Sequence, residues 1–273
     1  MDDQEYDLIS QQILKLTGID LAHYKVQQMR RRLTGLSSAN APSVAEYCQL
    51  IKKDPDALSK LRDFLTINVS EFFRDAEQFE ILRTEVFPEL LKNRPRLNVW
   101  SAGCSHGGEP YSVAMMLEEL APGQNHRVLA TDLDDAVIAK ARNGGPYTSA
   151  DVNNVDGKLL LKYFDKPDNM YTLTDQMRKK VTFKKQNLLR DVFETGFDLI
   201  MCRNVVIYFN DEAKDRLYRG FQNSLRDRGV LFIGATESLL AAAELGLTRV
   251  NNCFYRKSSK ESAGARPARA AKV

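Results

Sequence analysis

The run VWSAGCSHGGEPY, residues 99–111, constrains the fold of this chain more than any other segment. It begins as a short apolar strand, continues through a loop with three glycines, and ends in a helical first turn, where Pro110 is well placed. Glycines let the backbone approach a ligand closely, and a helix start offers unpaired N–H groups. This order predicts a ligand-binding turn of an open α/β sheet, with an ordinary glycine-rich turn as the alternative.

Strand and helix patterns alternate from residue 97 onward, which predicts a doubly wound α/β domain over residues 97–255. Apolar strands are expected in LNVW, RVLATD, KVTFKK, FDLIMC and GVLFIGA. The stretch at about 150–180 breaks this rhythm with many turn formers, so we expect an inserted subdomain there. Residues 256–273 are basic and low in complexity, which predicts a disordered tail.

Residues 1–65 show only helical periodicity, which predicts an all-helical N-terminal domain. In its second helix, Val26, Met29 and Leu33 recur at the helical repeat, so we expect all three to face inward. Residues 66–96 are predicted to connect the two domains, mostly as helix. The expected helix boundaries are a stop near Gly18, a helix over about residues 21–33, a cap at Ser43 and a start near Pro55.

Charge and cysteine content argue against several classes of protein. Lys plus Arg number 39 against 36 Asp plus Glu, and the basic tail after Tyr255 accounts for this excess, so nucleic-acid binding is not predicted. Four scattered cysteines and three histidines form no metal-ligand pattern, and reduced thiols in the cytoplasm are expected. With no long apolar run and an acidic N-terminus, neither membrane insertion nor a signal peptide is predicted.

Two acidic side chains follow neighbouring predicted strands. The glycine spacing is not the GxGxxG of dinucleotide sites, so the loop suits a ligand without a phosphate, and the Glu109 carboxylate can face a sulfonium or ammonium group. Asp132 ends the next strand, where an acidic residue can accept hydrogen bonds from ribose hydroxyls. The alternative is a helix N-cap, but Asp134 is better placed for that role.

Polar residues also follow the later strands. Asn187 can pair with an adenine edge while Leu188 covers the ring, although an ordinary turn is equally consistent with the sequence. Arg203 and Asn204 come at the carboxyl end of a buried strand, where charge is costly unless it is paired or used. A salt bridge to a nearby carboxylate is the alternative for Arg203.

Six segments in this order resemble the chemotaxis receptor methyltransferases, which are S-adenosylmethionine (SAM)-dependent protein-glutamate O-methyltransferases. They are TINVSEFFRD, VWSAGCSHGGEPYS, LATDLD, NLL, CRNVVIYF and GVLFIGATES. The resemblance implies an all-helical N-terminal domain, then a Rossmann-like SAM-methyltransferase domain with a small inserted β-subdomain. It implies SAM as cofactor, S-adenosylhomocysteine as product, and the cytoplasmic methylation helices of chemoreceptors as substrate.

The resemblance also implies roles for individual residues. Arg74 and Tyr208 would be the catalytic residues. Lys25, Arg31 and Arg32 would recognise the acidic receptor helices, with a merely solvated charged face as the alternative. The implied SAM contacts are Asn68, Ser70, Arg74, Gly103, Glu109, Asp132, Asn187, Leu188, Arg203 and Asn204.

The chain departs from the family pattern at a few positions. Gly108 stands where the family usually has an acid, and His106 and Ser70 stand where threonine is usual. YFDKPDNMYTLTD lacks the glycines of relatives that bind a receptor's C-terminal pentapeptide, so dependence on such a tail is not expected. The alternatives are a SAM enzyme with another acceptor, a non-catalytic SAM-binding regulatory module and, more distantly, a nicotinamide dehydrogenase.

Overall fold

The computed structural model describes residues 1–66, 70–239 and 241–259. Contacts within the chain separate it into two compact units. The first, the helical unit, holds the described residues of Met1–Val69 together with Val205–Leu217. The second, the α/β unit, holds those of Ser70–Asn204 and Tyr218–Val273. The strand and helix pattern placed residues 205–217 with the α/β domain, whereas by contacts this segment groups with the helices.

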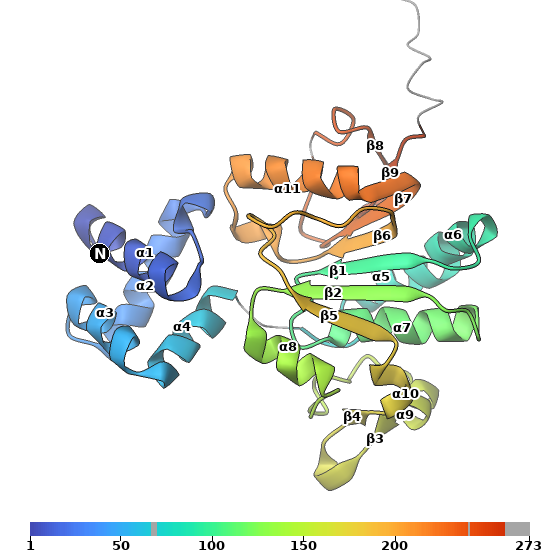
Figure 1. Ribbon diagram of the computed structural model, residues 1–273, viewed down its shortest axis with the longest axis horizontal. Coiled ribbons are helices and arrows are strands. Elements are labelled where there is room, and N and C mark those ends of the chain that lie inside the picture. Colours follow the sequence, from blue (N-terminus) through green and yellow to red (C-terminus); the bar gives the residue numbers. More distant parts are fainter. Residues whose placement is uncertain (67–69, 240, 260–273) are drawn as a thin grey trace, which may run out of the picture. The chain divides into compact units, whose positions relative to one another are not determined.

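The helical unit contains the predicted helices in the predicted order (Figure 1). Gly18 ends the first helix with φ 76°, a left-handed conformation that suits glycine. The Ser43 hydroxyl accepts a hydrogen bond from the Glu46 N–H and so caps the third. The elements are α1 (Asp3–Thr17), the 3₁₀ turn η1 (Leu21–His23), α2 (Val26–Asn40), α3 (Val44–Lys53), α4 (Pro55–Thr66), the 3₁₀ turn η4 (Val206–Tyr208) and the start of α11 (Asp211–Ser224).

One predicted core position in this unit is wrong. Met29 and Leu33 are buried as expected, but Val26 is 46% exposed. The helix begins at Val26 rather than near residue 21, because η1 and a short extended segment precede it. Val26 therefore lies in the first turn of α2, at the end of the apolar face rather than inside it.

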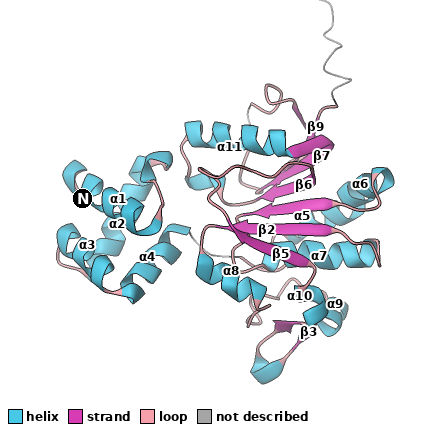
Figure 2. Ribbon diagram, viewed as in Figure 1, coloured by secondary structure: helices cyan, strands magenta, loops and turns pink. Residues whose placement is uncertain are grey.

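The α/β unit is built on a seven-stranded sheet in the order β5-β2-β1-β6-β7-β9-β8 (Figure 2). The first five strands in this order are mutually parallel, and β9 pairs antiparallel with both β7 and β8. The chain order reverses at β1, between β2 and β6, and open α/β sheets bind ligands at the carboxyl ends of strands at such a point. The strands are β1 (Asn98–Ala102), β2 (Arg127–Asp132), β5 (Val181–Lys185), β6 (Phe197–Cys202), β7 (Leu225–Ile233), β8 (Leu247–Arg249) and β9 (Phe254–Lys257).

Helices cover this sheet and share its apolar core. Phe72, Phe87, Val99 and Tyr111 are fully buried in that core. The segment predicted to connect the domains carries α5 (Ala76–Ile81), a π-helical turn (Leu82–Val86) and α6 (Phe87–Asn93) in one continuous run. The helices after β1 and β2 are α7 (Gly108–Leu120) and α8 (Asp135–Arg142).

The inserted subdomain is more helical than expected. Its two strands, β3 (Phe164–Asp165) and β4 (Thr172–Leu173), form a two-stranded antiparallel sheet. The helices α9 (Gly157–Tyr163) and α10 (Asp175–Arg178) flank this hairpin. Among the described residues, no helix combines the length and the apolar character needed to cross a membrane.

Candidate active site

The loop after β1 is held in shape by glycines and by bonds to the neighbouring strand. Gly103 and Gly107 have φ values of 85° and 95°, which side chains rarely allow. The N–H groups of Gly103 and Cys104 donate to the Thr131 carbonyl at 2.8 and 2.9 Å. Because Thr131 belongs to β2, the loop lies against the end of that strand.

The Asp132 carboxylate at the end of β2 accepts three backbone hydrogen bonds. Its Oδ2 accepts from the Ser105 N–H at 2.8 Å, and its Oδ1 accepts from Leu133 at 2.7 Å and from Asp134 at 3.1 Å. Asp134 caps α8 by accepting from the Ala136 N–H, as the sequence indicated. Burial raises the pKa of the Asp132 carboxyl above its ordinary value, while the three N–H donors act in the opposite direction.

These bonds decide what kind of ligand the loop can take. A phosphate site needs several backbone N–H groups aimed at an anion. Here the N–H groups of Gly103, Cys104 and Ser105 already donate to protein oxygens. A carboxylate has about four acceptor positions, and Asp132 uses three of them. The arrangement therefore leaves an acceptor position for a hydroxyl group, while the three N–H groups are not free to bind a phosphate.

Asn187 and Leu188 lie beside Asp132. Asp132 pairs with Lys185 in the parallel register of β2 and β5, and the Gln186 N–H donates to the Asp132 carbonyl. The Asn187 side-chain oxygen accepts from the Leu189 N–H at 3.0 Å, which fixes the turn. The side-chain NH₂ of Asn187 is the part of this residue suited to a ligand.

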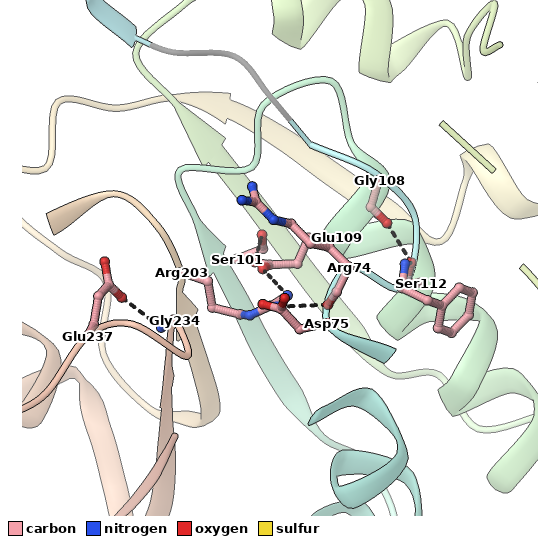
Figure 3. A network of polar contacts seen from close by, with 10 residues as sticks. Arg74, Asp75, Ser101, Gly108, Glu109, Ser112, Arg203, Gly234 and Glu237 are labelled. Atoms are coloured by element: carbon pink, nitrogen blue, oxygen red, sulfur yellow. Dashed lines mark hydrogen bonds and ion pairs between the residues drawn. The ribbon is translucent and has the colours of Figure 1, made fainter. Parts of the chain in front are cut away.

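A buried ionic network lies beside the loop (Figure 3). The Ser101 hydroxyl donates to Glu109 Oε1 at 2.7 Å, and Arg203 Nη1 lies 3.3 Å from Glu109 Oε2. Arg203 Nη2 donates to Asp75 Oδ2 at 2.6 Å and to the Arg74 carbonyl at 2.8 Å. The salt bridge weighed as the alternative for Arg203 is thus present, with two carboxylates instead of one.

Burial and charge act in opposite directions on Glu109. Burial raises the pKa of its carboxyl above the ordinary value, and Arg203, the Ser101 hydroxyl and Arg74 oppose that rise. The Arg203 guanidinium also lies over the rings of Phe79 and Phe232, 5.2 and 4.7 Å from their centres. The charges of Glu109 and Arg203 therefore offset part of the cost of burying each other.

The segment 70–75 crosses the start of α7. The Phe73 N–H donates to Ser112 Oγ at 2.9 Å, and this hydroxyl donates to the Gly108 carbonyl at 2.7 Å. His106 Nε2 lies 2.7 Å from the Ser70 carbonyl. A Cβ at Gly108 would lie 2.8 Å from the Glu71 carbonyl carbon. Glycine at 108 thus accompanies a close approach of two backbone segments.

Asn204 continues the site beyond β6. It has a φ of 60°, and a Cβ placed on Gly234 would come within 3.0 Å of its backbone N. The Gly234 N–H donates to Glu237 Oε2 at 2.7 Å. The residue that follows β7 and the turn that carries Asn204 thus lie close together.

The structure divides the predicted residues between its two units. Tyr208, Lys25, Arg31 and Arg32 lie in the helical unit, and Asn68 lies outside the described residues. Those that meet around the carboxyl ends of the strands are Ser70, Arg74, Gly103, Glu109, Asp132, Asn187, Leu188, Arg203 and Asn204.

Arg32 differs from its two predicted companions. Lys25 and Arg31 are exposed. The Arg32 guanidinium donates to the Phe64 carbonyl and lies over the rings of Phe64 and Tyr208. Burial lowers the pKa of Arg32 below its ordinary value. This side chain thus has a packing function within the helical unit.

Four residues of the site were not predicted from the sequence: Asp75, Ser101, Ser112 and Glu237. Asp75 and Ser101 bond to Arg203 and Glu109, which the sequence pattern did indicate. Asp75 is adjacent to Arg74, and Ser101 is a polar residue inside an apolar strand. Those two signals were available in the sequence. Within the described residues, no cluster of three or more His, Cys, Asp or Glu side chains could hold a metal ion.

Comparisons with known proteins cover both units. The family model "CheR methyltransferase, SAM binding domain" matches residues 68–251, and "CheR methyltransferase, all-alpha domain" matches residues 4–66. A "Chemotaxis protein methyltransferase" of Listeria monocytogenes is 39% identical over 258 residues, which span 94% of this chain and 98% of that protein. "Chemotaxis protein methyltransferase 1" of Pseudomonas aeruginosa is 34% identical over 247 residues, 86% of this chain and 90% of that protein.

Proposed function

The chain belongs to the CheR chemotaxis protein methyltransferases, and we propose that the residues at the carboxyl edge of its sheet hold SAM for the methylation of chemoreceptor glutamates. It is a SAM-dependent protein-glutamate methyltransferase, and chemoreceptors are its substrates. We assign separate parts of that activity to particular residues of the site.

The observation that carries the proposal is the order of three polar positions along the sheet edge. Glu109 follows β1, Asp132 ends β2 and Asn187 follows β5, and these strands are consecutive neighbours. Neighbouring strands lie roughly 4.8 Å apart. The methionine part, the ribose and the adenine of SAM follow one another in a line, and each needs a different partner.

The three positions match those needs chemically. We assign Glu109 to the positively charged methionine part, because its carboxylate is buried and oriented by Ser101 and Arg203. We assign Asp132 to the ribose hydroxyls and Asn187, with Leu188, to the adenine. The remaining proposed contacts are Asn68, Ser70, Gly103, Arg203 and Asn204.

Methyl transfer to a glutamate requires no proton transfer to a residue of the protein. A receptor glutamate has an ordinary pKa of about 4.3, so that it is already ionised at neutral pH and needs no general base. SAM supplies an electrophilic methyl group on a sulfonium. Attack of a glutamate oxygen on that methyl carbon would break the carbon–sulfur bond and leave the bonding electrons on sulfur. The task of the site is to align these atoms, which can contribute roughly 7–11 kcal/mol.

We assign the alignment of the incoming carboxylate to Arg74. Its side chain extends away from the Arg203–Asp75 pair in Figure 3, while its carbonyl is bound by Arg203. A guanidinium binds a carboxylate in a defined geometry with two N–H groups. Too tight a pair would lower the nucleophilicity of the carboxylate, so orientation is the stronger contribution.

We also propose that the Tyr208 hydroxyl helps to orient the reacting groups. The Tyr208 backbone is fixed within the helical unit, where its carbonyl accepts from the Lys25 N–H at 3.0 Å. Tyr208→Phe keeps the ring under Arg32 and removes only the hydroxyl. We expect a lower kcat with unchanged thermal stability, and an unchanged kcat would remove Tyr208 from the mechanism.

Receptor recognition is proposed for two exposed basic residues, Lys25 just before α2 and Arg31 within it. Lys25 and Arg31 are open to solvent, and methylation helices are rich in glutamate. Arg32 contributes less than its position in the sequence suggests, because its guanidinium bonds within the unit. The hairpin of β3 and β4 contains no glycine. We therefore propose that methylation proceeds without a receptor C-terminal pentapeptide, which removal of that peptide from the receptor would test.

The cofactor assignment is tested by calorimetric titration with SAM. Asp132→Asn should weaken binding about tenfold to a hundredfold, because a charged acceptor is lost. Asp134→Asn is the matched control: asparagine caps a helix as well as aspartate does, so SAM affinity should be unchanged. Equal affinities of the Asp132 variant and the wild type would overturn the assignment.

A further inference from the structure

Arg203 is bound by two carboxylates and one backbone carbonyl of the protein. Its side chain is 3% exposed, whereas those of Glu109 and Asp75 are 12% and 36% exposed. Asp75 therefore lies at the open side of the network and next to Arg74 in the chain. Arg203 binds both the Asp75 carboxylate and the Arg74 carbonyl through the same nitrogen, Nη2.

The backbone around Arg74 adopts an unfavourable conformation. Phe73 and Asp75 have φ values of 53° and 59°. Residues other than glycine adopt this left-handed conformation at a cost of roughly 1–3 kcal/mol each. Such a turn persists only when its surroundings hold it. Ser112 holds the Phe73 N–H, and Arg203 holds the other side through Arg74 and Asp75.

We propose that Asp75 is a positioning residue for the methyl transfer, which acts by fixing the turn that directs the Arg74 side chain toward the acceptor carboxylate. This inference rests on the proposed role of Arg74. The Asp75 carboxylate also pairs with Arg203, whose Nη2 binds the Arg74 carbonyl, so that it keeps this contact to the turn in place.

The test uses Asp75→Asn in the full-length enzyme with receptor-containing membranes. Asparagine tolerates left-handed backbone as well as aspartate does, so the substitution changes charge and not backbone preference. We expect kcat to fall about tenfold or more, because small displacements of an orienting group are costly. The KM for SAM and the thermal midpoint should change little, since Glu109 still neutralises Arg203.

A double-mutant cycle with Arg74→Ala separates positioning from a general structural effect. If Asp75 acts through Arg74, Asp75→Asn should lower kcat in the wild type and leave kcat of the Arg74→Ala variant nearly unchanged. Equal fold losses in the two backgrounds would overturn the inference and leave the role of Arg74 intact. Full activity of Arg74→Ala alone would overturn the role of Arg74, and this inference with it.

Glu77→Gln is the matched control. Glu77 is an exposed acid in the first turn of α5, two residues from Asp75. Removing its charge should leave kcat within about twofold of the wild type. The same loss in Glu77→Gln and Asp75→Asn would attribute the effect to overall charge and would contradict the proposal.

Discussion

The two units treat polar groups in opposite ways. Among the described residues of the helical unit, Ser37 is the buried polar side chain, and the charged side chains are exposed or, like Arg32, half-buried. The α/β unit buries Glu109, Arg203, Glu237 and others. Burying charge is costly unless it is paired, and paired burial adds little stability by itself. The contrast indicates that the α/β unit retains these groups for chemistry, whereas the helical unit keeps its charges for a surface.

Burial of charge alone does not mark the site, however. Asp198, near the amino end of β6, accepts from the Asn98 N–H at 2.8 Å and pairs with Arg226 at 3.0 Å. It lies in the same sheet as the candidate site but at the opposite ends of the strands. What distinguishes Glu109 and Asp132 is their position at the carboxyl edge, beside the reversal of strand order.

The largest effect is expected from removing the buried cation. Arg203→Met should lower the free energy of unfolding of the full-length protein by about 3–5 kcal/mol, because Glu109 and Asp75 lose their shared partner. Urea titration measures this loss. SAM affinity should fall as well.

Arg31→Met is the counterpart in the helical unit. Arg31 is exposed, so its replacement should change the free energy of unfolding by no more than about 0.5 kcal/mol and leave SAM affinity unchanged. Similar losses of stability in the two variants would remove the distinction between the units.

Two glycine-to-alanine substitutions should change the free energy of unfolding in opposite directions. A Cβ at Gly108 would lie 2.8 Å from the Glu71 carbonyl carbon, so Gly108→Ala should destabilise the protein by about 1–3 kcal/mol. A Cβ at Gly35 in α2 would meet nothing within 4 Å, so Gly35→Ala should stabilise it by about 0.5–1 kcal/mol. Thermal unfolding measures both. A tolerated alanine at 108 would show that the close approach of segment 70–75 is not required.

A smaller effect is expected from pH, and only for the α/β unit. Burial raises the pKa of Asp132, so this carboxyl takes up its proton at higher pH than an exposed aspartate does. SAM affinity should be constant above the raised pKa and should fall below it, by at most about tenfold per pH unit. The free energy of unfolding changes in the opposite direction. The contribution of Asp132 to it is larger below the raised pKa and is lost as the pH rises, because protonation removes a buried charge. Calorimetry across the acidic range checks this, and an Asp132→Asn variant with the wild-type pH profile would refute it.

The smallest effects are expected at the exposed basic surface. Lys25→Ala and Arg31→Ala should each weaken receptor binding by no more than about 1 kcal/mol. Added salt should weaken receptor binding more than SAM binding, because exposed charges are screened and buried pairs are not. Sedimentation with receptor membranes at two ionic strengths measures receptor binding. Equal salt dependence of receptor binding and SAM binding would argue against a basic recognition surface.

The sequence predicted those parts of the molecule that depend on local chemistry. The helix caps at Ser43 and Asp134 and the stop at Gly18 involve bonds within a few residues. The glycine loop and Asp132 come from two successive strand–loop–helix patterns. The α/β fold itself is evident from the alternation of apolar segments.

What escaped prediction depends on contacts between distant residues. Asp75 and Arg203 are 128 positions apart, and the sequence around either residue does not indicate that the other is its partner. Val26 was placed in the core because periodicity does not show where a helix starts. β8 and β9 are short strands: β9 is held by pairing with β7, and β8 by pairing with β9. A segment of three or four residues carries too short a pattern to predict a strand.

The most direct test of the proposed site is methyl transfer by Arg74→Ala. Wild-type and variant enzyme are incubated with methyl-labelled SAM and chemoreceptor membranes, and label released as methanol by base reports glutamate methyl esters. We expect base-labile label with the wild type and about a hundredfold less with Arg74→Ala, while calorimetry still detects SAM binding to both. Undiminished transfer by a variant that binds SAM normally would contradict the assignment of Arg74 and the site described around it.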